Sequence, residues 1–117
     1  MMNKIDLSQS VSGEEWGEFF DRFSTNNRGR HISMETIDEE IGDYKLISNA
    51  PLLAMIYDRP DKGDNLAIEV GQDQMTYGHT IDSPVEVSTG QNTNGEIVAM
   101  CIIDNTGRKT LIKLHAD

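Results

Sequence analysis

The first clear hydrophobic pattern in the chain has the period of an α-helix and consists of aromatic residues. They are spaced at i, i+3, i+4 and i+7, as Trp16, Phe19, Phe20 and Phe23. This spacing places the rings on one face of a helix, where they would pack against a core. Ser12 and Glu15 precede the pattern as an S-x-x-E capping box. The sequence therefore predicts an amphipathic helix that begins after Ser12 and ends in the polar segment 24–29.

From residue 30 onward the period changes to two, which indicates β-strands separated by turns. Alternating apolar and polar residues predict strands at 30–36, 66–70, 75–81, 85–88 and 110–114, with a shorter one at 44–47. Successive apolar residues predict strands covered on both faces at 52–57, after Pro51, and at 97–103. The segment DNTG at 104–107 predicts a tight hairpin turn between the last two strands.

A single helix followed by short strands predicts an α+β fold. We expect the N-terminal amphipathic helix to pack on a strongly bent antiparallel β-sheet or on a small SH3-like or Sm-like barrel. Residues 1–10 show little periodicity and are expected to form a flexible N-terminus. Residues 11–117 are expected to form one α+β domain, because the length is that of a single domain and no linker interrupts it.

Composition disfavours several classes of partner. Twenty acidic and ten basic side chains give a net charge of −10, and the basic residues are scattered. Binding to nucleic acid or to an anionic membrane needs clustered positive charge, so neither partner is expected. The longest apolar run, at 97–103, is far shorter than the roughly 20 residues of a membrane span. Together with the lone Cys101, these features predict a soluble cytoplasmic protein.

The segment YGHTIDSP at 77–84 brings the residue types of a serine hydrolase together, as His79, Asp82 and Ser83. In an extended chain, however, the four steps from His79 to Ser83 span about 13 Å. Adjacent residues of a strand also point to opposite faces, so Asp82 and Ser83 cannot both face the imidazole. The segment is better interpreted as a strand end and a turn before Pro84, and we predict no catalytic residue in it.

Neither a metal nor a cofactor is predicted. Asp58, Asp61 and Asp64 recur at every third position, but an EF-hand loop needs ligands at positions 1, 3, 5 and 12. Arg59 and Lys62 also offset their charge, which favours a solvated loop. The three histidines lack the close spacing of common metal sites, and no glycine-rich phosphate loop is present.

Five residues remain as candidates for binding. Tyr57, Tyr77 and His79 are amphipathic side chains of the kind that line pockets and interfaces. Arg28 and Arg30 form the most basic spot in the chain and could bind an acidic partner or a carboxylate ligand. We therefore predict a noncatalytic binding or protein-interaction module, with a protein partner or self-association through a sheet edge or the helix face.

Two alternatives stay open. The first is a small enzyme, or a ligand-binding or metal-binding protein, with a site around His79 and Tyr77. It requires a carboxylate within hydrogen-bonding reach of His79 in a concave pocket. The second is a nucleic-acid-binding Sm-like barrel, which requires Arg28, Arg30 and Arg108 on one face.

Three segments carry a resemblance to a known family. They are EEWGEFFDRFSTNNRGRHISMETI, PLLAMIYDRPDKGDNLAIEV and CIIDNTGRKTLIKL. Over roughly residues 14–114 the chain resembles a family of small bacterial proteins catalogued as a domain of unknown function. The resemblance rests on packing and turn features, so it implies a shared fold and a bacterial origin, and it implies no activity.

Overall fold

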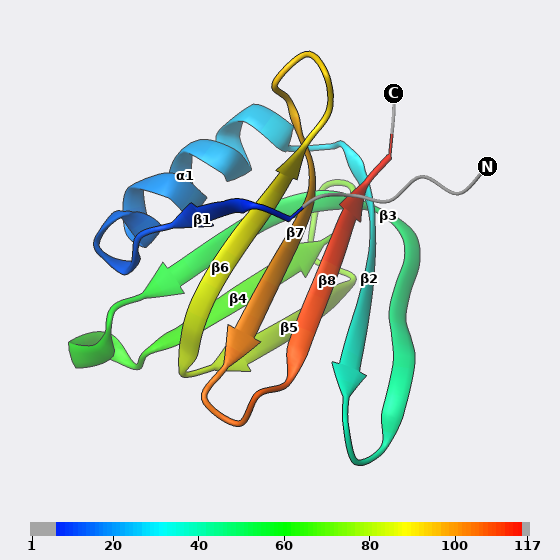
Figure 1. The fold of residues 1–117 in the computed structure, drawn as a ribbon. Coiled ribbons are helices and arrows are strands. Elements are labelled where there is room, and N and C mark those ends of the chain that lie inside the picture. Colours follow the sequence, from blue (N-terminus) through cyan, green and yellow to red (C-terminus); the bar gives the residue numbers. More distant parts are fainter. Residues whose placement is uncertain (1–6, 116–117) are drawn as a thin grey trace.

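The computed structural model describes residues 7–115, which form one α-helix and one eight-stranded antiparallel sheet (Figure 1). The helix is α1 (Trp16–Asn27), and two 3₁₀ turns are η1 (Gly13–Glu15) and η2 (Pro60–Lys62). The strands are β1 (Gln9–Val11), β2 (His31–Asp38), β3 (Gly42–Asp58), β4 (Asn65–Val70), β5 (Tyr77–Asp82), β6 (Pro84–Gln91), β7 (Ile97–Asp104) and β8 (Lys109–Leu114). The predicted α+β class is confirmed.

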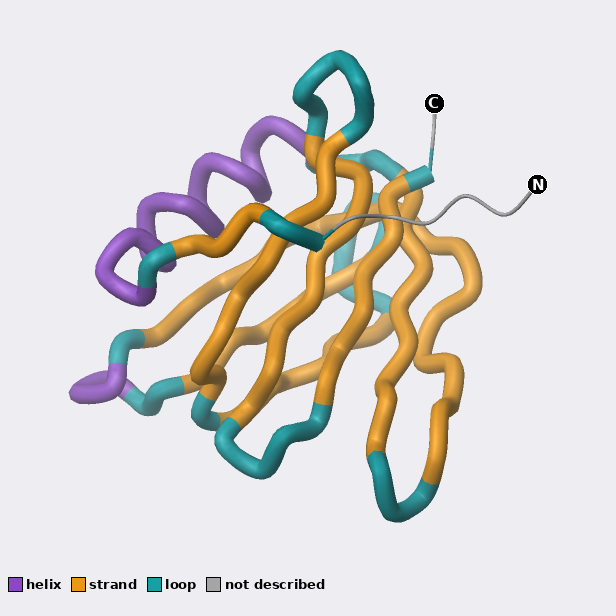
Figure 2. The backbone as a smooth tube through the Cα atoms, viewed as in Figure 1, coloured by secondary structure: helices purple, strands orange, loops and turns teal. Residues whose placement is uncertain are grey.

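The sheet folds back on itself because one long strand belongs to both of its layers. The strand order is β1-β6-β7-β8-β2-β3-β4-β5. Residues 42–51 of β3 pair with β2, and residues 52–58 pair with β4. Figure 1 shows β3 rising beside β2 and then passing behind the front layer, and Figure 2 shows that the strand continues through this bend. The strand order is linear among the described residues, so these pairings do not establish the predicted small barrel.

The prediction of two separate strands at 44–47 and 52–57 is therefore wrong. Pro51 lies inside the continuous strand β3 and pairs with His31 of β2. Proline lacks the N–H that an inner strand needs, and it is tolerated at sheet edges and irregular positions. Pro51 meets this condition because it stands where β3 leaves β2 and meets β4.

The core fills the space between the two layers and is closed on one side by α1. Its fully buried members are Phe20, Ile32, Met34, Leu52, Met55, Leu66, Ile68, Val70, Val87, Met100, Ile102 and Ile112. The aromatic stripe predicted for the helix supplies Trp16, Phe20 and Phe23 to this core, whereas Phe19 is only half-buried. Burial of one such side chain contributes about 1.5–3 kcal/mol to the free energy of folding. The apolar core is therefore the main contact that joins the two layers and the helix.

The start of the helix differs from the predicted capping box. The Ser12 side chain makes no capping hydrogen bond, and the turn η1 precedes α1. The entry of the chain is instead fixed by the Trp16 indole N–H, which donates to the Val11 carbonyl oxygen at 2.9 Å. Val11 belongs to β1, which also includes Gln9 and Ser10 of the segment 1–10 that the sequence assigned to a flexible terminus. Residues 1–6 lie outside the described part of the chain.

None of the helices formed within residues 7–115 is both long and apolar enough to span a membrane.

Candidate functional site

The two long free edges of the sheet are the most distinctive surface features of the fold. One is β5, which pairs with β4 alone and ends the strand order. The other is the first part of β3, at residues 42–51, which pairs with β2 alone. At the opposite end of the sheet, β1 is only three residues long. The unpaired N–H and C=O groups of a free edge can bind a further strand, so each long edge is a candidate interaction surface.

Strand β5 presents a regular row of backbone groups. Its register with β4 runs without a shift from Tyr77 opposite Val70 to Asp82 opposite Asn65. The Ser83 N–H donates to the Asp64 carbonyl oxygen at 2.8 Å and continues the same register. Hydrogen-bonded pairs alternate with non-bonded pairs along an antiparallel ladder.

The outward groups of β5 follow from this alternation. The backbones of Tyr77, His79 and Ile81 face β4, in step with Ser83. The N–H and C=O groups of Gly78, Thr80 and Asp82 therefore point away from the sheet.

The side chains of β5 do little to protect this edge. Natural edge strands are commonly blocked by proline, lysine or a β-bulge. Residues 77–82 contain no proline, no lysine and no bulge, and their single formal charge at neutral pH is that of Asp82 at the end. Exposed apolar side chains flank the strand, with Met75 53% and Val85 57% accessible. A regular, nearly uncharged edge between exposed apolar residues favours pairing with another strand.

The first part of β3 is protected in the ways that β5 is not. Its register with β2 shifts twice, between Ile32 and Met34 and between Met34 and Glu35. Such bulges twist a strand and interrupt its ladder. Asp43 and Lys45 also place charges on this segment.

Tyr77 and His79, both predicted as binding residues, lie on β5. By strand alternation they share a face with Ile81, which is buried in the core. His79 is half-buried beside Ile68, its partner on β4. Burial lowers the pKa of His79, and the positive charge of Arg108 lowers it further. His79 is therefore uncharged at neutral pH.

The enzyme alternative requires a carboxylate that bonds to the His79 imidazole. Within residues 7–115 no hydrogen bond or ion pair reaches this ring. No group of three His, Cys, Asp or Glu side chains in the same range is placed to hold a metal ion.

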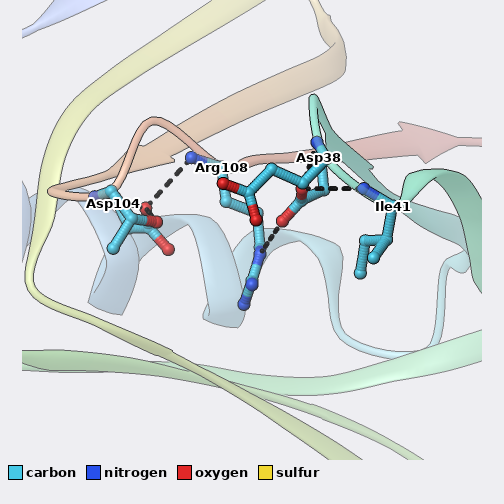
Figure 3. Close-up of polar contacts among 6 residues, drawn as sticks. Asp38, Ile41, Asp104 and Arg108 are labelled. Atoms are coloured by element: carbon cyan, nitrogen blue, oxygen red, sulfur yellow. Dashed lines mark hydrogen bonds and ion pairs between the residues drawn. The ribbon is translucent and has the colours of Figure 1, made fainter.

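Arg108, the cation near His79, connects two turns at this end of the molecule (Figure 3). Its Nε donates to Asp38 Oδ2 at 3.0 Å, and its backbone N–H donates to Asp104 Oδ1 at 3.1 Å. Asp38 Oδ1 accepts from the N–H groups of Glu40 and Ile41. The bond from the Glu40 N–H, followed by that from Arg108, lowers the pKa of Asp38. This carboxylate therefore caps the β2–β3 turn and bridges it to the β7–β8 turn.

Tyr57 occupies a different part of the surface from Tyr77 and His79. Its ring meets Trp16 edge to face, with centroids 5.3 Å apart. Burial, followed by the charge of Asp64, raises the pKa of the Tyr57 hydroxyl. Tyr57 lines an open cavity of about 430 Å³ together with Gly13 and Gly17. It is therefore mainly a packing partner of the helix.

The two predicted arginines follow the end of α1. Arg28 is exposed, whereas Arg30 is half-buried. The Arg30 Nε donates to the His115 carbonyl oxygen at 3.0 Å, and its Nη1 donates to Asn27 Oδ1 at 3.2 Å. Arg30 lines a groove of about 380 Å³ against α1. The structure thus separates the five predicted binding residues: Tyr77 and His79 lie on β5, Tyr57 lies against Trp16, Arg30 lines this groove, and Arg28 is exposed and is not among the residues that line it.

The sequence did not predict a contact between Ser33 and His115, because only the pairing of distant strands brings these two residues together. Ser33 Oγ contacts His115 Nε2 and also donates to the Ser48 carbonyl oxygen. A hydroxyl carries a single proton, so His115 Nε2 must be the donor to Ser33 Oγ. A serine nucleophile needs the reverse arrangement, in which the imidazole accepts the hydroxyl proton. The pair is therefore structural.

These features define a class: a small α+β protein built on one folded-over antiparallel sheet whose end strand is regular and open. The chain belongs to a family of unknown function, DUF5335, whose model matches residues 7–117. This confirms the resemblance predicted from the sequence. An uncharacterized protein of Aquifex aeolicus (strain VF5) is 27% identical over 107 residues, which cover 92% of this chain and 91% of that protein. No solved structure matches the chain.

Proposed function

We propose that the protein is a noncatalytic interaction module whose binding surface is the free edge of β5, and that a second copy of the chain occupies it. The observation that carries this proposal is the unbroken register of β5 with β4, which directs the backbone groups of Gly78, Thr80 and Asp82 outward. Strand addition obtains its affinity from such main-chain hydrogen bonds.

The outward-facing backbone groups of β5 can pair with the same groups of a second copy. In an antiparallel pair of β5 strands centred on Thr80, Thr80 faces Thr80 of the second copy and Gly78 faces Asp82. Each outward-facing residue then meets another outward-facing residue, so their N–H and C=O groups can pair. Threonine pairs across strands are favourable.

The negative charge of the chain opposes dimerisation and makes it depend on salt concentration. Each chain carries a net charge of −10, so two copies repel one another at long range. Salt screens this repulsion over a Debye length of about 10 Å at 0.1 M, whereas backbone hydrogen bonds at a covered edge are little affected. Dimerisation therefore strengthens as salt is added.

Analytical ultracentrifugation of two variants tests the proposal. Thr80→Pro removes an N–H that faces away from β4, so it blocks the edge without breaking the β4–β5 ladder. Thr80→Val is the matched control, because it keeps the N–H and a β-branched side chain. We expect wild type and Thr80→Val to dimerise more strongly at about 0.5 M than at about 0.05 M salt, and Thr80→Pro to remain monomeric. A wild-type monomer at both salt concentrations, or a Thr80→Pro dimer as strong as wild type, would contradict the proposal.

A further inference from the structure

A groove of about 380 Å³ lies between the second half of α1 and the loop that joins β6 to β7. Its apolar surface includes Phe19 and Ile97, and two guanidinium groups border it, those of Arg22 and Arg30. Glu96 is the acidic residue among those that line it. Two cations in one groove stand out on a chain of net charge −10.

The Arg30 guanidinium is held in one orientation. Its Nε bonds to the His115 carbonyl oxygen and its Nη1 to the Asn27 side chain. Among residues 7–115, its Nη2 amino group makes no hydrogen bond, so donors remain for a ligand. A guanidinium that is already oriented loses little side-chain entropy when it binds a planar anion.

Arg22 is a weaker second cation at the rim. It forms an ion pair with Glu18 one turn earlier on α1, and both side chains are largely exposed. Exposed pairs of this kind contribute little free energy, so a ligand anion can compete for Arg22.

The opposite wall of the groove has a fixed shape. Asn92 Oδ1 accepts from the N–H groups of Asn94 and Glu96, and Asn92 Nδ2 donates to Glu96 Oε1. Gly95 takes the positive φ of 82° that closes this loop. The loop is therefore organised by its own hydrogen bonds before any ligand arrives.

The floor of the groove offers an aromatic surface. Phe19 is half-buried, lies roughly parallel to Phe23 at 6.0 Å between centroids and meets Phe20 edge to face at 5.0 Å. Because its neighbours fix this ring, its accessible part can take an apolar group without reordering.

We propose that the groove binds an organic monocarboxylate with an aromatic or aliphatic body. Arg30 holds the carboxylate, Arg22 adds a second cation at the rim, and the body rests on Phe19 and Ile97. A carboxylate is favoured over a doubly charged phosphate because Glu96 places a negative charge in the same groove. This site is separate from the proposed function, since it shares no residue with β5.

Titration of the full-length protein with phenylacetate, followed by ¹H–¹⁵N correlation spectra, tests the charge requirement. The uncharged phenylacetamide, which has the same ring, is the matched probe. We expect saturable shifts at the Arg30 Nε–H and the Asn27 side-chain amide with phenylacetate, and at least about tenfold weaker binding of phenylacetamide. Equal affinity for the two probes, or no shift at these groups, would overturn the proposal.

Charge-changing variants locate the site. Arg30→Gln should weaken phenylacetate binding at least about tenfold. Because Arg30 also holds the His115 carbonyl oxygen, Arg22→Gln on the exposed helix face is the second test, with about threefold weaker binding expected. Arg59→Gln makes the same charge change outside the groove and should bind as wild type. The proposal fails if Arg22→Gln and Arg59→Gln weaken binding equally, since the effect would then be net charge alone.

Phenylacetate binding by the Glu96→Gln variant tests whether the groove prefers a negatively charged ligand. Glutamine keeps an oxygen that can accept from Asn92 Nδ2, so the loop retains its shape. Removing the carboxylate charge should tighten phenylacetate binding about threefold. Weaker binding by this variant would mean that Glu96 assists the ligand and that a carboxylate is the wrong occupant.

Discussion

The two long free edges of this sheet show how similar exposure can have opposite consequences. The first part of β3 is irregular, with two register shifts and two charged residues, Asp43 and Lys45. Strand β5 is regular, carries no lysine and directs three residues' backbone groups outward. Features of the first kind prevent unspecific strand pairing, whereas a strand without them can accept a partner. Strand β5 therefore lacks the features that protect the first part of β3.

The largest expected difference between the edges concerns stability. Ile68, on β4 directly beside His79, is fully buried, whereas Ile47 on the β3 edge is half-buried. We expect Ile68→Ala to lower the free energy of unfolding by about 2–5 kcal/mol, because it leaves a cavity in the core. Ile47→Ala should lower it by about 1 kcal/mol or less. Urea unfolding of both variants measures this, and equal losses would show that the two edges are anchored alike.

Placing a lysine on β5 and removing the lysine from β3 tests whether a charged edge residue decides which edge pairs with another strand. Thr80→Lys places a charged edge residue on β5 and should raise the dimer dissociation constant by at least about tenfold. Lys45→Thr removes the lysine from the first part of β3 but leaves both register shifts, so it should not change the oligomeric state. Light scattering over a concentration series distinguishes the variants. A Lys45→Thr protein that forms larger assemblies would show that charge, rather than bulging, protects β3.

His79 should make the β5 edge sensitive to acid. Its folded-state pKa is lowered below the ordinary value of 6.5, so the unfolded chain binds the proton more tightly. Stability is therefore highest above about pH 6.5 and falls as the pH drops towards the lower folded-state pKa. His79→Gln should remove this part of the pH dependence in urea unfolding between about pH 7.5 and pH 5. An unchanged profile would mean that His79 is as solvated as in the unfolded chain.

The smallest expected effect concerns the turn that joins β2 to β3. Asp38 has a lowered pKa, because the Glu40 N–H and Arg108 bond to its carboxylate. Its contribution to stability is present above its unfolded pKa of 3.8 and is lost as the pH falls through the lowered folded value. Asp38→Asn should lower the melting temperature slightly at neutral pH and not in strong acid. A decrease of the same size at both pH values would point to lost geometry instead of lost charge.

Local patterns predicted the elements with strong periodicity. The helix stripe from Trp16 to Phe23 and the β7–β8 hairpin are where the sequence places them, because each depends on neighbours only a few residues away. The turn at Asp104 is also set by near neighbours, because the Asp104 side chain accepts from the Thr106 N–H and Gly107 adopts a φ of 89°.

Long-range features escaped prediction. Nothing local indicates that β3 continues through Pro51, because the strand is completed by β2 on one side of this residue and β4 on the other. The groove beside Arg30 also could not be predicted from local sequence, because its two walls, α1 and the β6–β7 loop, are more than sixty residues apart in the chain. Strand alternation did place Tyr77 and His79 on one face, but whether that strand was central or an edge depends on the strand order.

Amide hydrogen exchange of β5 at low and high protein concentration measures whether a second copy of the chain covers its free edge. The N–H groups of Gly78, Thr80 and Asp82 point away from β4, whereas those of Tyr77, His79 and Ile81 bond to it. We predict that the first group exchanges rapidly in the dilute monomer and becomes protected as concentration and salt increase, while the second group is protected throughout. If Gly78, Thr80 and Asp82 exchange equally fast at every concentration, the edge of β5 does not bind a second copy.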